Sequence, residues 1–136
     1  MAAIVTSDQG HGIDRMPEFS ARMQWVPGTE GTKDVALVEL SGSLSTDTSA
    51  QLRESLRPAA QWRFVILEVA GVAFLDSVGV GVLVGVARSA QAAGGGLRLA
   101  CAGEPVFRVL NSTGLHRIIP THPTVLDAVN SFTKSG

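Results

Sequence analysis

The sequence predicts an α/β fold with a largely parallel sheet, and two observations support this. Short apolar stretches typical of strands alternate with stretches of helical length and periodicity from about residue 35 to residue 132. The stretch at residues 64–69 is almost continuously apolar, which is typical of a central strand covered on both faces. Alternating strands and helices favour parallel pairing with helical cover, so we expect a mixed, mostly parallel sheet of about five strands with about four helices.

Length and charge limit the number of domains and the classes of partner. The 136 residues suffice for one domain with its own core. The net charge of −1 argues against nucleic acid or an anionic membrane as the main partner, because both select a basic surface. The N-terminus does not resemble a signal peptide and no apolar run is long enough to cross a bilayer, so a cytoplasmic protein without membrane insertion is expected. The single cysteine, Cys101, lies in an apolar run and is expected to be a buried, inert thiol.

The N-terminal part predicts a tail followed by a hairpin. Residues 1–17 contain glycines and few large apolar side chains, so a flexible tail is expected. Apolar and polar residues alternate over 19–25, which predicts a strand with one buried face. A turn-rich connection leads to a second strand at 35–40, and the two strands are expected to pair antiparallel.

The next elements are a loop at 42–48 and a first helix. Thr48 and Gln51 have the spacing of a capping box, and Pro58 lies near the end of the helix. The central strand at 64–69 follows, and after it a second helix that stops at the glycines 94–96.

The C-terminal part predicts two further strands and two further helices. A strand is expected at 97–102, a third helix from 104 to Gly114, and a short edge strand at 118–119. The fourth helix starts near 121–123, and its expected buried side chains are Val125, Leu126, Val129 and Phe132.

The start of the second helix is the strongest candidate for a functional site. Asp76 and Ser77 are residue types that cap a helix N-terminus. The Ser77 hydroxyl would then lie where backbone N–H groups lack partners and the helix dipole is positive, so a phosphate there would find donors. This pattern is compatible with a phosphoserine switch and equally with a cap that serves only to start a buried helix.

Two enzymatic interpretations fit less well. Gly79, Gly81 and Gly85 nearly match G-x-G-x-x-G, but the predicted strand ends some ten residues earlier and the last spacing is one residue too long. A G-x-S-x-G nucleophile is absent because Leu75 occupies the first glycine position. The three histidines are scattered along the chain. We therefore predict no catalytic residue, no cofactor and no metal site.

The second helix has no charge before Arg88 and contains three glycines, each costing about 1 kcal/mol relative to alanine. Such an apolar helix is normally buried on most sides. The glycines would let it pack closely on the sheet, or would let a partner approach its first turn.

Residues 74–83, Phe-Leu-Asp-Ser-Val-Gly-Val-Gly-Val-Leu, resemble the signature of STAS domains, specifically of bacterial anti-sigma factor antagonists. Three further segments resemble family segments in order and spacing: residues 38–44, with a strand and a G-x-L turn, residues 95–99, and residues 106–120. The resemblance covers residues 18–132, which leaves tails at 1–17 and 133–136. It implies the STAS fold.

The resemblance also implies a function. Members of the family bind an anti-sigma factor, often a serine kinase, and so free a sigma factor. The kinase phosphorylates the serine after the Asp, here Ser77, and a phosphatase reverses the change; the protein itself is not an enzyme. The partner-binding residues that the resemblance implies are Ser43, Leu44, Ser45, Asp47, Asp76, Ser77, Val78, Gly79 and Val80.

The sequence departs from the family pattern at two places. Val78 stands where Ser or Thr is common, which leaves Ser77 as the one acceptor hydroxyl of the motif. The turn after Gly42 reads Ser43-Leu44-Ser45 instead of acid-Leu-Asp, and its nearest carboxylate is Asp47. This loss of charge keeps a second hypothesis open, in which the chain is an unphosphorylated scaffold or a transporter accessory subunit.

Overall fold

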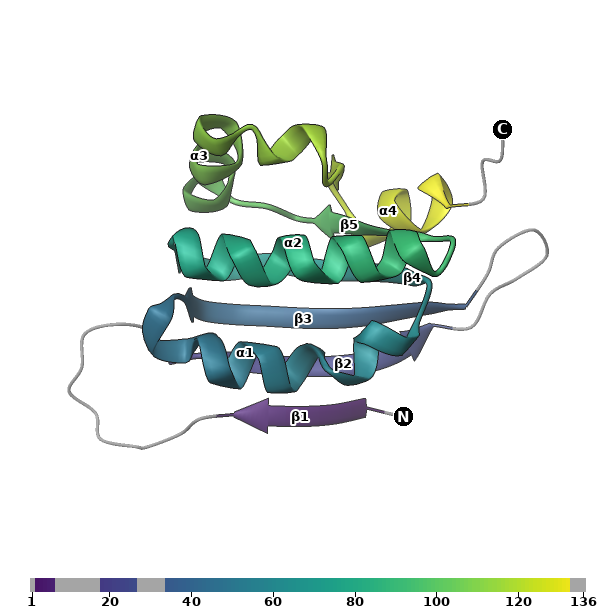
Figure 1. Cartoon of the computed structure of the whole chain (residues 1–136), viewed down its shortest axis with the longest axis horizontal. Helices are drawn as coiled ribbons and strands as arrows, with labels where there is room; N and C mark the ends of the chain where they lie inside the picture. Colours follow the sequence, from purple (N-terminus) through teal and green to yellow (C-terminus); the bar gives the residue numbers. More distant parts are fainter. Residues whose placement is uncertain (1, 7–17, 27–33, 133–136) are drawn as a thin grey trace.

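The computed structural model describes residues 2–6, 18–26 and 34–132, and within them a six-stranded sheet has its strands in sequence order (Figure 1). The strands are β1 (Ala2–Thr6), β2 (Ser20–Val26), β3 (Val35–Leu44), β4 (Phe64–Leu75), β5 (Gly96–Ala100) and β6 (Thr121–His122). Pairs β1–β2 and β2–β3 are antiparallel, and the other three neighbouring pairs are parallel. The predicted mixed α/β fold with an antiparallel N-terminal hairpin is confirmed.

The helices cover both faces of this sheet. They are α1 (Ser49–Leu56), α2 (Ser77–Ala92), α3 (Glu104–Thr113) and α4 (Val125–Ser131). Helices α1 and α2 lie side by side over one face (Figure 1). On that face, side chains such as Val38, Leu67 and Leu83 form the larger buried cluster, to which α3 also contributes. A smaller cluster on the opposite face joins Leu37, Ile66 and Ala128 of α4.

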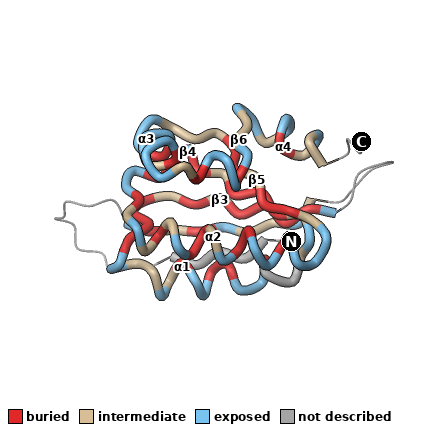
Figure 2. The backbone as a smooth tube through the Cα atoms, turned by 45° about the horizontal axis from the view of Figure 1, so that its top comes forward, coloured by how far each residue is buried: buried red, intermediate tan, exposed pale blue. Residues whose placement is uncertain are grey.

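The central strands carry most of the buried backbone (Figure 2). Val65, Ile66 and Leu67 of β4 are all fully buried although their side chains alternate between the two clusters. Burial on both faces is what a nearly continuous apolar run predicts. The expectation of a covered central strand is therefore confirmed.

Helix α4 is fastened to β5 and β4 through its last turn. The Phe132 ring meets Phe64 edge-on at a centroid distance of 4.9 Å, and the Arg98 guanidinium carbon lies 4.4 Å from the Phe132 centroid. Arg98 Nε also donates a hydrogen bond to Ser131 Oγ at 3.0 Å. Partial burial lowers the pKa of Arg98. A cation over an aromatic face stabilises such a partly desolvated site.

Strand β1 is one strand more than the sequence indicated. It pairs with β2 from Ala2 opposite Gln24 to Thr6 opposite Ser20, inside the segment expected to be a tail. A five-residue strand depends on a neighbour for its hydrogen bonds, and its own sequence carries too short a pattern to predict it. The remaining tail residues, 7–17 and 133–136, lie outside the described residues, so the tail boundaries stay predictions.

Strands β3 and β4 are longer than predicted and reach the candidate site. Their parallel pairing passes two register shifts and ends with Leu44 beside Leu75, so residues 42–44 belong to a strand and the predicted loop begins at Ser45. At Gly42, φ is +91° and a Cβ atom would lie 2.2 Å from the carbonyl oxygen of Glu18. Only glycine fits such a backbone and such a close approach.

Three local predictions are wrong. Thr48 and Gln51 do not form a capping box, because Thr48 Oγ1 donates to Ser43 O at 2.6 Å and accepts from Ser45 N–H at 3.0 Å. The segment 118–119 is not a strand: it follows a 3-10 turn at Leu115–Arg117, with Ile119 buried and Ile118 exposed.

The third wrong prediction concerns the buried face of α4. Leu126 is 66% exposed and Ala128 is buried instead, while Val125, Val129 and Phe132 are partly buried. The helix starts only after Thr124, whose Oγ1 accepts the N–H of Asp127 at 3.0 Å. The positions that pack on the sheet, 125, 128, 129 and 132, recur at helical spacing, and Leu126 lies off this stripe.

Candidate partner-binding site at the start of helix α2

The candidate site lies where β3 and β4 end side by side. Leu44 is the last residue of β3 and Leu75 the last of β4, and the Asp76 N–H donates to Leu44 O at 3.1 Å. The turn after β3 therefore lies beside the start of α2. Residues that are some thirty positions apart in the sequence meet here because the two strands are parallel neighbours.

The Asp76 carboxylate joins these two segments. Its Oδ1 accepts the N–H groups of Val78 at 2.9 Å and Gly79 at 3.0 Å, which confirms Asp76 as the N-cap of α2. Its Oδ2 accepts the N–H of Thr46 at 3.0 Å and the Thr46 hydroxyl at 3.3 Å. These donors, the Gly79 N–H first, hold the pKa of Asp76 below its usual value of 3.8 against the opposing effect of desolvation. Asp76 is therefore ionised at neutral pH.

Ser77 is the first residue of α2 and is exposed. Within the described part of the chain its hydroxyl has no hydrogen-bond partner. The expectation that a phosphate here would find waiting backbone donors holds only in part. Val78 and Gly79 donate to the Asp76 carboxylate and Val80 donates to Asp76 O at 2.9 Å, whereas the N–H of Ser77 has no partner among the described residues. Ser77 instead presents a free hydroxyl next to an ionised carboxylate.

The residues that sequence reasoning assigned to partner binding divide by burial. Asp47 and Ser77 are exposed, and Asp76, Val78 and Val80 are partly exposed. The other four, Ser43, Leu44, Ser45 and Gly79, are buried. The structure thus brings the set together around Asp76, but only part of it is available at the surface, and the buried members position the rest.

The glycines of α2 serve two different purposes. A Cβ on Gly79 would lie 2.3 Å from Leu44 O, so this glycine lets the helix press against the end of β3. Cβ atoms on Gly81 and Gly85 would meet nothing within 4 Å, and both residues are exposed. Close packing and an open face, which the sequence left as alternatives, therefore apply to different glycines.

Sequence reasoning missed Thr46 at the site, and it missed the exposure of Phe74 near the end of β4. Thr46 supplies both donors to Asp76 Oδ2, and no local signal identifies it, because the two bonds depend on β3 and β4 ending side by side. Phe74 is 43% exposed two residues before Asp76. No local pattern separates an exposed phenylalanine at the end of a strand from a buried one.

The histidines His116 and His122 and the cysteine Cys101 lie in other parts of the fold than this site. His116 lies in the 3-10 turn, with Nδ1 3.1 Å from Leu110 O, and His122 lies in β6. Cys101 is half-buried rather than buried, and desolvation raises the pKa of its thiol. Across residues 2–6, 18–26 and 34–132 no three His, Cys, Asp or Glu residues are grouped as metal ligands, and none of the helices there is long and apolar enough to span a membrane.

Ser43 has a buried hydroxyl whose effect on the stability of the protein can be tested. It is 4% exposed, and its Oγ has no hydrogen-bond partner among the described residues. Removing a buried, unpaired hydroxyl relieves a desolvation penalty, so Ser43→Ala is expected to leave the free energy of unfolding unchanged or to raise it by up to about 1 kcal/mol. Urea unfolding monitored by tryptophan fluorescence measures this. A loss of stability would show that this hydroxyl has a partner in the folded protein.

Comparison with known proteins gives a consistent result. The family described as STAS domain matches residues 27–128. An anti-sigma F factor antagonist of Paenibacillus polymyxa is 31% identical over 106 residues, which are 76% of this chain and 91% of the relative. An anti-sigma-B factor antagonist of Bacillus subtilis is 34% identical over 83 residues, which are 60% of this chain and 76% of the relative.

Solved structures show the same fold. The anti-sigma factor antagonist SpoIIAA in its unphosphorylated form superposes with a TM-score of 0.61 at 23% identity, over 80% of this chain and 94% of that one. The phosphorylated form of SpoIIAA from Bacillus superposes with a TM-score of 0.55 at 22% identity, over 80% and 97% of the two chains.

Proposed function

Because the chain belongs to the STAS domain family of bacterial anti-sigma factor antagonists, we propose that it binds an anti-sigma factor around Ser77 and so frees a sigma factor. We propose further that the anti-sigma factor is a serine kinase that phosphorylates Ser77, and that a phosphatase restores the active form. Both steps would take place in the cytoplasm. The chain then acts as a regulatory binding protein and not as an enzyme.

The observation that carries this proposal is the exposed, unbonded hydroxyl of Ser77 beside the ionised carboxylate of Asp76. Across residues 76–80 Ser77 is the only hydroxyl, and the nearby Thr46 hydroxyl donates to Asp76. A kinase that reaches this surface therefore meets one free acceptor. SpoIIAA, which shares the fold, is known in an unphosphorylated and a phosphorylated form, which supports a comparable modification here.

The direction of the switch follows from charge. A phosphate adds about −1.5 to −2 charges at neutral pH. At Ser77 this charge would lie next to the ionised Asp76, on a stretch that also carries the partly exposed Val78 and Val80. A weakly charged, partly apolar contact would become strongly anionic, which opposes docking of a partner that fits the unmodified surface.

The test uses each anti-sigma factor encoded in the same genome. Each is purified and titrated with the wild-type chain, Ser77→Ala and Ser77→Asp, and each is incubated with ATP before intact-mass measurement. We expect one anti-sigma factor to bind wild type and Ser77→Ala with the same affinity. It should bind Ser77→Asp at least tenfold more weakly because of charge repulsion. Only chains that contain Ser77 should gain one phosphate. Ser112→Asp, on the exposed surface of α3, is the matched control and should bind like wild type.

Binding to no anti-sigma factor would reject the proposal. Equal binding of Ser77→Asp and wild type, together with no phosphate transfer, would reject the switch and favour an unphosphorylated scaffold. Isolation of transporter subunits with the chain from its own cells, without an anti-sigma factor, would favour the transporter accessory role.

A further inference from the structure

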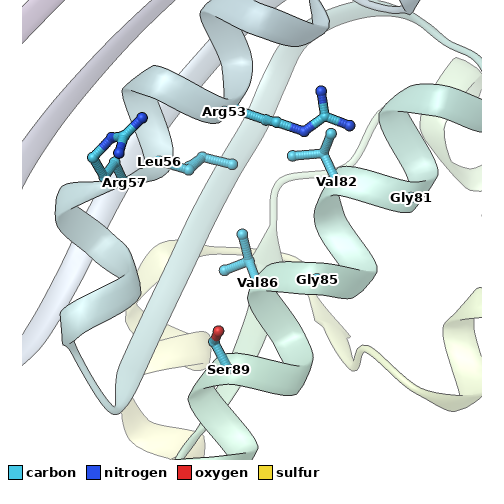
Figure 3. A pocket seen from close by; sticks show the side chains of 8 residues that line it. All are labelled: Arg53, Leu56, Arg57, Gly81, Val82, Gly85, Val86 and Ser89. Carbon is cyan, nitrogen blue, oxygen red and sulfur yellow. The ribbon is translucent and has the colours of Figure 1, made fainter.

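A surface groove runs between α1 and α2, and its volume is about 290 Å³. Figure 3 shows the side chains that line it, which come from the sides of the two helices that face each other. They are Arg53, Leu56, Arg57, Gly81, Val82, Gly85, Val86 and Ser89. This volume is at the lower limit of the range of about 300–1,000 Å³ that is typical of small-molecule sites. The groove is also open to solvent along the two helices. A shallow, open groove suits the side chains of a protein partner better than an enclosed metabolite.

The floor of the groove is apolar and one wall is bare backbone. Leu56, Val82 and Val86 are buried and form the floor. Gly81 and Gly85 form the wall, and the space where their side chains would lie is open. Glycine is a poor helix former, and at these two positions no described residue comes close enough to require a glycine. What they provide is room for the backbone of another molecule to approach α2.

The rim of the groove is cationic. Arg53 and Arg57 are one helical turn apart on α1, and Figure 3 shows the Arg53 side chain reaching from α1 toward Val82 of α2. Arg57 pairs with Glu54 at 3.0 Å, whereas Arg53 has neither an ion pair nor a hydrogen bond with any described residue. An unpaired guanidinium over an apolar floor favours a carboxylate that accompanies an apolar side chain.

The groove is continuous with the candidate site. Ser77, Gly81, Gly85 and Ser89 follow each other at intervals of four residues and are all exposed, so they lie on one face of α2. From Ser77 to Gly81 the helix rises about 6 Å, which is within the Debye length of about 8 Å at physiological salt. A phosphate on Ser77 would therefore be felt by a charged group at the near end of the groove.

We propose that the groove between α1 and α2 binds an acidic amphipathic helix of the anti-sigma factor, with a carboxylate on Arg53 and an apolar side chain on Leu56, Val82 and Val86. The inference rests on the proposed function for the identity of the partner. The stretch from Gly81 to Ser89 is about 12 Å long and accommodates about two turns of such a helix. The two glycines allow the close approach that packing of a third helix requires.

The test measures the dissociation constant of the full chain and the anti-sigma factor with two groove variants. Arg53→Glu reverses the rim charge, and Gly85→Leu fills the open wall. Each has a matched control on α2 outside the groove: Arg88→Glu reverses another exposed arginine, and Gln91→Leu adds leucine at another exposed position. We expect both groove variants to bind at least tenfold more weakly and both controls to remain within twofold of wild type. Circular dichroism melting checks that all four are folded.

The outcomes separate the two proposals. Weaker binding by Ser77→Asp with unchanged binding by Arg53→Glu and Gly85→Leu would overturn the groove and leave the proposed function standing. Weaker binding by the groove variants with unchanged binding by Ser77→Asp would uphold the groove and overturn the switch. Restored binding of Arg53→Glu by a glutamate-to-lysine change in the anti-sigma factor would identify the carboxylate that contacts Arg53. A wild-type chain that binds no anti-sigma factor would overturn both.

Discussion

Gly79→Ala should destabilise the protein by about 1–2 kcal/mol, although alanine is the better helix former. The added Cβ would lie 2.3 Å from Leu44 O and 2.9 Å from Leu75 Cδ1, and the nearer contact is backbone that cannot rotate away. Overpacking of this kind costs about 1–3 kcal/mol and sometimes more, and the gain in helix propensity of about 1 kcal/mol offsets only part of it. Urea unfolding at equilibrium measures the change.

The same helix contains the control for Gly79→Ala. A Cβ on Gly81 meets no atom within 4 Å, so Gly81→Ala keeps the propensity gain without a clash and should stabilise the protein by about 0.5–1 kcal/mol. If both variants changed stability in the same direction, close packing of Gly79 on Leu44 would be refuted.

Gly79→Ala should also alter the candidate site. Leu44 O accepts the N–H of Asp76, so pushing Leu44 away from α2 lengthens that bond and strains the two hydrogen bonds that Thr46 donates to Asp76 Oδ2. We therefore expect increased amide hydrogen exchange at Thr46 and Asp76 relative to Gly81→Ala. Equal exchange in the two variants would show that the contact with Leu44 does not support the site.

Asp76→Ala should lower the free energy of unfolding by about 1.5–3 kcal/mol at neutral pH. Loss of a helix N-cap costs about 0.5–2 kcal/mol, and the substitution also removes both hydrogen bonds from Thr46. Asp76→Asn is the matched variant, because its side-chain oxygen still caps Val78 and Gly79 but carries no charge. It should lose less stability than Asp76→Ala, as measured by urea unfolding.

The contribution of Asp76 to stability depends on pH, and the direction of this dependence follows from its pKa. Its pKa is lower in the folded protein than the usual value of 3.8, so folding favours the ionised form. The stabilisation is complete above the unfolded pKa and is lost as the pH falls through the folded pKa. The stability difference between wild type and Asp76→Asn should therefore be constant near neutral pH and should shrink below about pH 4. A difference that grows in acid would contradict the hydrogen bonding at Asp76.

Features encoded locally were predictable from sequence. Asp76 caps α2 because its side chain reaches the N–H groups two and three residues ahead, and no tertiary contact is needed for that inference. The buried strand at 64–69 was evident because burial on both faces requires a continuous apolar run. The glycines 94–96 marked the end of α2 because Gly94 adopts φ +94°.

Features that depend on distant parts of the chain were not predictable. The bond from Thr46 to Asp76 spans thirty residues and exists because β3 and β4 are parallel neighbours of matched length. Two adjacent isoleucines at 118–119 do not distinguish a strand from a turn that buries one of them. Likewise, the separate roles of Gly79 and Gly81 depend on where Leu44 lies, and the phosphorylation of Ser77 stays a prediction.

Asp76 already accepts the N–H groups of Val78, Gly79 and Val80, and this has a consequence for how a signal would be stored. With these three N–H groups already bonded, a phosphoryl group on Ser77 would act mainly through the charge that it adds at the surface, and the signal would reside in the covalent bond. The lifetime of the signal would equal the lifetime of the phosphate ester, so its duration would be set by the phosphatase and not by the fold.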